Sequence, residues 1–184
     1  MKKILMLMLL VMLLVATPVM AKEGLFFGAN FIPSADMSGD AGRGLDSGSG
    51  YGFKLGLGLS KYFSIEGIYD RLSFDVKGGG DSVDVDGLAV DLRVNFPLTT
   101  LDSAKIMSFE PYVLIGYGAY DAKSDGESNS GSGLRYGIGI EQYLFRELSV
   151  NVGYTSTSVT FDTKPKELDG TIRTFEIGLI YHFI

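Results

Sequence analysis

The residues of this chain that could do chemistry are charged side chains placed at alternate positions along short segments. In these segments one parity is apolar and the other carries glycine or charge, as where Phe53 and Leu55 alternate with Gly52, Lys54 and Gly56. The charged residues on the glycine-bearing parity are Lys54, Glu66, Asp91, Arg93, Arg135, Glu141 and Glu176. Leaving a buried charge without a partner costs several kcal/mol, so these side chains must pair if their parity faces an interior.

The heights of these charges along their segments indicate that they meet. Counted from the segment ends, Lys54, Arg135 and Glu176 lie at one level, and Glu66 and Asp91 lie slightly lower. One interpretation is a structural plug that fills the interior, and the other is a narrow ion path or gate. The eight alternating segments of this chain predict an eight-stranded barrel. We favour the plug because a barrel of that size leaves no wide channel.

Other kinds of chemistry find little support in the sequence. The chain has no cysteine, which excludes disulfides, thiol catalysis and thiolate metal sites. His182 is its one histidine, so a metal site built on two imidazoles is excluded, and we expect a structural role for it at the rim of the fold. We therefore expect no enzyme activity, no catalytic residue, no cofactor and no metal.

Two loop-like segments resemble ligand-binding motifs only at first sight. Residues 131–137 are rich in glycine and serine, but their spacing does not match a nucleotide loop and no helix follows. Asp81, Asp84 and Asp86 stand near Gly87, but the spacing of a calcium loop is broken and its closing glutamate is missing. A solvated acidic loop is the favoured interpretation, with weak divalent-cation binding beside lipopolysaccharide as the alternative.

The alternating segments predict β-strands, because period two places one parity on each face of a sheet. Eight such segments can be marked, and no stretch after the first residues shows a helical period. They span 24–32, 50–60, 62–75, 83–96, 109–121, 133–143, 148–161 and 171–183.

The connections between these segments alternate in length. We predict long, charged loops at 33–49, 77–82, 122–132 and 162–170, and tight turns at 60–62 and 142–147. The connection at 97–107 is longer than this scheme requires. Long loops at one end and short turns at the other are typical of outer-membrane barrels, whose long loops face outside.

The first residues resemble a cleavable export signal. Lys2 and Lys3 precede an apolar run of about a dozen residues, and small residues stand at Val19 and Ala21. A transmembrane anchor is the alternative, but the run is shorter than the roughly 20 residues that span a bilayer. We therefore predict a signal peptide at 1–21 and one barrel domain at 22–184. Removing the two lysines takes the net charge from −6 to about −8, which argues against nucleic acid as a partner.

Alternation alone does not decide whether the apolar parity faces lipid or an inner core. A soluble barrel of the lipocalin kind gives the same pattern. However, the other parity is rich in glycine, which a water-facing surface does not need and a crowded interior does. Aromatic residues also gather near segment ends, among them Tyr62, Phe96, Tyr143 and Phe145, as in the girdles of membrane barrels. We therefore predict an all-β, eight-stranded antiparallel up-and-down transmembrane barrel.

The segment at 22–184 resembles the small eight-stranded outer-membrane barrels of the OmpA/OmpX-like group. The resemblance rests on the Gly-Leu-Gly-Leu segment at 56–59, Gly-Ile-Gly-Ile at 137–140, Pro-Tyr-Val at 111–113 and the terminal Tyr181-x-Phe183. It implies that Tyr181 and Phe183 act as the signal that the barrel-assembly machinery reads, although Ile184 follows them here. It also implies a Gram-negative-type outer membrane as the location, reached through the general secretory route.

The sequence therefore predicts a monomeric porin-like barrel of the cell envelope with a structural or surface-interaction role. Its expected partners are outer-membrane lipid and lipopolysaccharide, with periplasmic chaperones and the assembly machinery during biogenesis. A narrow channel for ions or small solutes is the main alternative. A soluble periplasmic ligand-binding barrel is a further one.

Overall fold

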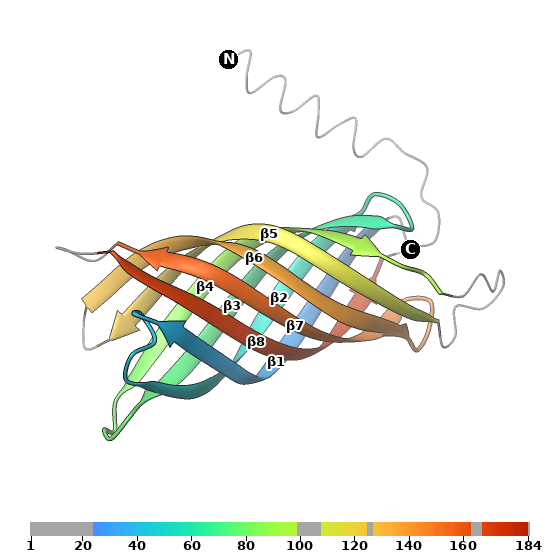
Figure 1. The fold of residues 1–184 in the computed structure, drawn as a ribbon. Helices are drawn as coiled ribbons and strands as arrows, with labels where there is room; N and C mark the ends of the chain where they lie inside the picture. The colour runs from blue at the N-terminus through green and yellow to red at the C-terminus, as the bar shows by residue number, and fades with distance from the viewer. Residues whose placement is uncertain (1–23, 99–107, 125–126, 163–166, 184) are drawn as a thin grey trace, which may run out of the picture.

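The protein folds as a closed antiparallel β-barrel, in which each strand pairs with its neighbours in sequence and β1 closes onto β8 (Figure 1). The computed structural model describes residues 24–98, 108–124, 127–162 and 167–183. Its eight strands are β1 (Gly24–Gly39), β2 (Leu45–Gly58), β3 (Phe63–Val76), β4 (Ser82–Asn95), β5 (Phe109–Ser124), β6 (Glu127–Tyr143), β7 (Leu148–Phe161) and β8 (Leu168–His182). The predicted up-and-down barrel is confirmed. The proposed signal peptide at 1–21 lies outside the described residues. Within the described residues, no helix is long and apolar enough to span a bilayer.

The barrel has two ends, which we name by what they carry. The terminal end carries Gly24, Phe183 and the connections 59–62, 96–108 and 144–147; the distal end carries the connections 40–44, 77–81, 125–126 and 162–167. In Figure 1 the distal end lies on the left.

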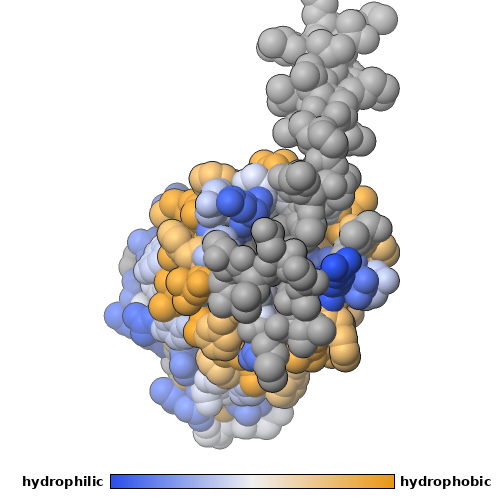
Figure 2. Space-filling view, turned by 90° about the vertical axis from the view of Figure 1, so that its right-hand side faces the viewer, coloured by the Kyte–Doolittle hydropathy of each residue, from blue (hydrophilic) through white to orange (hydrophobic). Residues whose placement is uncertain are grey.

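The outer wall of the barrel is apolar over most of its height. Val90, Ile138 and Leu179 point outward with 60%, 62% and 55% of their surface exposed, while the alternate positions of the same strands point inward. Figure 2, which looks onto the terminal end, shows hydrophobic residues along the flanks. A surface of this kind would be unstable in water but suits lipid, so the soluble barrel is the wrong interpretation.

Glycines on the inner parity make room for the large side chains opposite them. A Cβ on Gly56 would collide with the ring of Phe26, and one on Gly116 would collide with the carboxylate of Asp91. A Cβ on Gly153 would lie 2.6 Å from the hydroxyl of Tyr112. The glycine-rich parity is therefore a consequence of the narrow interior, in which a large side chain fits only because the residue beside it is a glycine without a side chain.

The distal ends of the strands correct the predicted loops. Most of 33–49 and 122–132 is strand, and the connections there shrink to 40–44 and 125–126. The strands contain 14 to 17 residues, whereas about 9–11 suffice to cross a bilayer. In the surplus part the pattern is inverted: Asp84 and Lys123 point outward, while Val85 and Phe74 are buried inside. The prediction of loops in these segments is wrong because it assigns strands only where the outward parity is apolar.

A β-bulge makes this change possible in β1. The register of β1 shifts around Pro33, between Ile32 and Ala35 against β2 and between Phe31 and Ser34 against β8. Proline is tolerated in sheets mainly at edges and bulges, because it cannot donate a ladder hydrogen bond. The bulge keeps both Ile32 and Ala35 inside although they lie on opposite parities.

Lipid exposure can be tested with an arginine placed on the wall. We expect Ile138→Arg to destabilise the barrel by about 2–4 kcal/mol in a folding titration in lipid vesicles, as arginine does near the midplane of such barrels. The matched control is Ser73→Arg, which places the same charge on the polar distal wall and should be close to neutral. Equal costs for both variants would contradict the lipid-facing assignment.

The orientation can be tested by cysteine labelling, because the chain has no cysteine of its own. Ser73→Cys, on the outer wall near the distal end, should react with a membrane-impermeant maleimide added to intact cells. Ser60→Cys, in the turn at 59–62, should react only after the outer membrane is opened. The reverse pattern would place the distal end in the periplasm.

Candidate functional site

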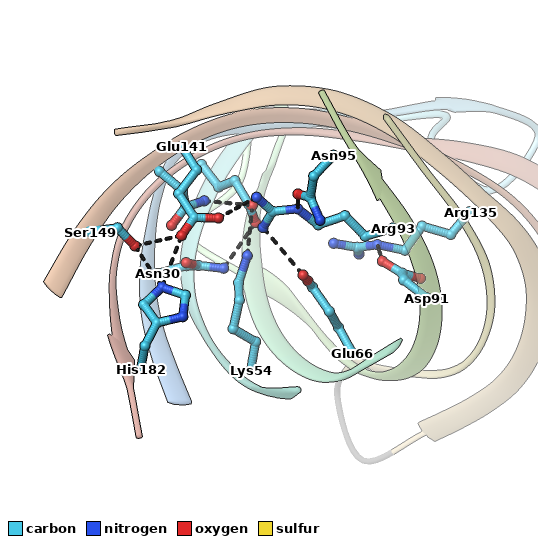
Figure 3. A network of polar contacts seen from close by, with 12 residues as sticks. Asn30, Lys54, Glu66, Asp91, Arg93, Asn95, Arg135, Glu141, Ser149 and His182 are labelled. Carbon is cyan, nitrogen blue, oxygen red and sulfur yellow. Dashed lines mark hydrogen bonds and ion pairs between the residues drawn. The ribbon is translucent and has the colours of Figure 1, made fainter. Parts of the chain in front are cut away.

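The charged residues predicted from the sequence all lie inside the barrel, where they form three groups of ion pairs and hydrogen bonds (Figure 3). In the first group, Glu176 on β8 accepts hydrogen bonds from three strands. Lys54 Nζ donates to it over 3.2 Å, Asn30 Nδ2 over 3.0 Å and Asn151 Nδ2 over 3.1 Å. Lys54 and Glu176 are both 2% exposed, so this ion pair has almost no competition from water.

The second group surrounds Arg93 on β4. Its Nε donates to Asn95 over 2.7 Å, its Nη1 to Glu66 over 3.2 Å, and its Nη2 to Glu141. The guanidinium carbon also lies 3.7 Å from the centre of the Tyr112 ring, an arrangement that adds cation–π attraction. One arginine thus ties together β3, β4, β5 and β6.

The third group is centred on Arg135 of β6. Its Nε donates to Asp91 over 3.0 Å and its Nη1 donates to Asp70 over 2.9 Å. Arg135 therefore reaches across the interior to β3 and β4. No direct contact joins Arg135 to Glu176 among the described residues, so the expected single cluster is divided into separate ion-pair groups.

Several buried polar residues of the interior were missed in the sequence. They share the inward parity of the predicted charges. Four of them are polar and uncharged, and the other two, Asp70 and Glu110, are acids on β3 and β5. They are Asn30, Asp70, Asn95, Glu110, Ser149 and Asn151. Parity was the signal that could have found them, since each stands an even number of residues from a predicted member or from another buried residue of its own strand.

His182 also takes part in this network at the terminal end. Its Nε2 lies 2.9 Å from Glu141 Oε1 and 3.1 Å from Ser149 Oγ, and Ser149 donates to Glu141 over 2.7 Å. The three residue types are those of a hydrolytic triad, but a triad needs the serine at Nε2 and the carboxylate at Nδ1. Here both partners share Nε2, so the arrangement holds the rim together and does not activate Ser149.

Acidic side chains outnumber basic ones in the interior. Among the described residues, the buried acids are Glu66, Asp70, Asp91, Glu110, Glu141 and Glu176, and the buried bases are Lys54, Arg93 and Arg135. One carboxylate oxygen of each of Glu66, Asp70 and Asp91 accepts from an arginine, and the other has no hydrogen-bond partner within the protein. The formal charge of these buried groups is therefore negative, which favours cations over anions in the interior.

An apolar cluster fills the interior above the ionic groups, toward the distal end. It contains Ile32, Ala35, Leu72, Phe74, Val85, Tyr120, Val159, Phe161 and Ile172. The barrel is therefore obstructed by ion pairs in its terminal half and by packed apolar side chains in its distal half.

The remaining candidate motifs are part of the walls. Asp84 and Asp86 point outward from β4, where they pair with Arg71 over 3.1 Å and Lys123 over 2.9 Å respectively. They do not form the calcium loop, and the described part of the chain holds no group of three or more acidic, histidine or cysteine side chains that could bind a metal. Residues 131–137 are an ordinary section of β6.

The two aromatic residues of the expected assembly signal lie on the outer surface at the terminal end. Tyr181 and Phe183 are 48% and 54% exposed, and their ring centres are 5.1 Å apart in an edge-to-face contact. Their position is accessible to another protein, and their part in assembly stays a prediction.

The apolar wall, the closed ladder and the ionic interior together define a transmembrane barrel of the outer-membrane class. The chain belongs to the family described as outer membrane protein beta-barrel domain, whose model matches residues 7–183. No match is found among curated proteins.

Solved structures with this fold come from several bacteria. Neisserial surface protein A, NspA, superposes with a TM-score of 0.67 at 14% identity, covering 87% of this chain and 97% of that one. Ail, the attachment invasion locus protein of Yersinia pestis, gives 0.52 at 17% identity, covering 88% and 99%. OprG of Pseudomonas aeruginosa gives 0.50 at 17% identity, covering 88% and 98%. At these identities the likeness shows the fold alone.

The division into ion-pair groups can be tested by double-mutant cycles. Glu176→Gln and Lys54→Met should each cost about 3–5 kcal/mol, because each leaves the other charge buried without its partner. The double variant should cost at least about 1 kcal/mol less than their sum. Glu176→Gln combined with Arg135→Met should show weaker coupling than the first cycle, because these two buried charges attract each other through space but share no hydrogen bond. Strong coupling in the second cycle and none in the first would contradict the observed pairing.

Proposed function

We propose that this protein is a structural or surface-interaction barrel of the outer membrane, with a lumen that does not conduct ions. The observation that carries the proposal is the double obstruction of the interior. Ion pairs such as Lys54–Glu176 cross the terminal half, and buried side chains such as Phe74 and Phe161 fill the distal half. With the lumen obstructed, the surfaces that remain for interactions with other molecules are the outer wall and the distal end.

The names of two structural neighbours agree with such a role. NspA is named a surface protein and Ail an attachment invasion protein. One solved structure of Ail holds sucrose octasulfate, a heparin analogue. A polyanion of that kind does not suit this chain, because its net charge is −6 and the distal bases Arg43 and Lys77 are already paired with Asp40 and Asp46. The proposed partners are lipid and lipopolysaccharide around the wall, and the assembly machinery at Tyr181 and Phe183.

A narrow cation path is the second candidate, because the excess of buried acids would favour cations in any water-filled gap. It differs from the first proposal in one measurable quantity, the steady conductance of the wild-type barrel. It does not require another fold or another location.

Planar-bilayer recording in potassium chloride separates the two candidates. We expect no steady current from the wild type. Arg93→Ser with Glu141→Ser should also stay closed, since the apolar cluster still blocks the distal half, whereas adding Phe74→Ala should open a small, cation-selective conductance. Sustained wild-type current would replace the proposal with the channel. Retention of the fold is checked for each variant by heat-dependent migration in unboiled and boiled gel samples.

A further inference from the structure

The distal mouth of the barrel contains an apolar cup that the described residues leave open. Its volume is about 210 Å³, and its walls include Met37, Ala41, Leu45, Val83, Phe161 and Leu168. Most of these side chains are only partly buried, and they pack directly on the apolar cluster below. The cup is thus a concave apolar surface at the end of the molecule that carries the charged connections.

The floor of the cup is closed. Ile32, Phe74 and Val85 belong to the cluster beneath it, with 1%, 0% and 1% of their surface exposed. The ion-pair groups lie further down toward the terminal end. A molecule that enters the cup therefore stays there or leaves through the mouth, so that the feature is a binding site and not the entrance of a path.

The cup stands clear of the lipid. On the outer wall at the same level, Asp84 pairs with Arg71, and Asp86 pairs with Lys123. Asp84 adjoins the lining residue Val83, and Lys123 adjoins Ala122 and Ser124, which also line the cup. Because this stretch of wall is charged, the mouth opens toward water and the tails of membrane lipids do not reach it.

The rim favours an uncharged ligand. Its polar groups are Arg43, Ser124 and Asn129, and the guanidinium of Arg43 is paired with Asp40 over 3.0 Å. The rim can therefore accept a hydroxyl or carbonyl group but offers no unneutralised charge to an acid. An apolar cavity of about 150 Å³ binds benzene, so a cup of this size accommodates a substituted ring or a short alkyl chain.

We propose that the distal cup binds a small, uncharged, apolar molecule taken from the surrounding water. The driving force is the removal of the cup's apolar lining and of the ligand from water. This gives the surface of the barrel a ligand site in addition to its proposed structural role.

The test uses the full mature chain in phospholipid nanodiscs, with methyl groups labelled for NMR and toluene as the probe. We expect saturable shifts at the methyl groups of Met37, Leu45 and Val83. The lipid-facing methyl groups of Val90 and Leu179 should change only in proportion to the toluene dissolved in the bilayer. Proportional change at all five residues would overturn the proposal.

The blocking variant is Ala41→Phe, which fills the cup and should weaken toluene binding at least tenfold. Its matched control is Ala119→Phe, the same change on the lipid-facing wall of β5, which should leave binding unchanged. Met37→Gln provides a second variant that makes the lining polar without adding bulk, and it should also weaken binding. Unchanged binding in both cup variants would overturn the proposal.

Two further titrations separate the possible sources of the apolar group. 1-Octanol should compete with toluene, since it is uncharged and its hydroxyl can reach the rim. Purified lipopolysaccharide should not compete, because its acyl chains remain in the membrane. Competition by lipopolysaccharide and none by octanol would show that the cup takes a lipid chain, contrary to the proposal.

Discussion

The narrow interior of an eight-stranded barrel is the constraint on which the rest of this structure depends. Eight strands leave just enough room for side chains, so each inward residue must fit its neighbours in size and in charge. The fit in size explains why Gly56 lies opposite Phe26 and why Gly153 lies beside Tyr112. The fit in charge explains why the long basic side chains reach across to carboxylates on other strands. Neither could be relaxed alone, because a larger residue at a glycine would push an ion pair apart.

The bilayer imposes a second condition, and its edge can be read from the change in the walls. Within the lipid the outside must be apolar, and the inside can then hold the polar residues. Beyond the lipid the outside faces water, so the strands carry Asp84 and Lys123 outward and bury Phe74 and Val85 inward. The distal part is therefore built like a small soluble barrel with an apolar core, standing on a membrane barrel with an ionic one. The bulge at Pro33 joins the two patterns within one strand.

Much of this architecture could be predicted from the sequence, because period two and glycine placement are local properties. The number of strands, their direction and the inward position of charges such as Arg135 follow from that pattern. The partners of Arg135 do not, since Asp70 and Asp91 lie on β3 and β4 and come within reach only through the tilt and register of the closed barrel. The sequence predicts loops in place of the distal strands for a related reason. The apolar residues of these strands stand on the parity that is polar elsewhere, and glycine and serine, which favour loops, are frequent among them.

The two halves of the interior raise the question of why the terminal half is ionic at all. Buried ion pairs are often no more stabilising than apolar residues of the same size, and the distal half shows that this chain can fill its lumen with apolar residues. The difference follows from the outward parity. In the membrane zone that parity must be apolar, so an apolar inward parity would create continuous hydrophobic stretches, which aggregate as exposed strands and approach the hydropathy of membrane-spanning helices. In the distal zone the outward parity is already polar, and apolar residues such as Val83 and Val85 can be placed inside without forming such a stretch. Alternation is thus kept along the whole strand while its sense is reversed, and the ionic lumen follows from keeping the unfolded chain soluble until it reaches its membrane.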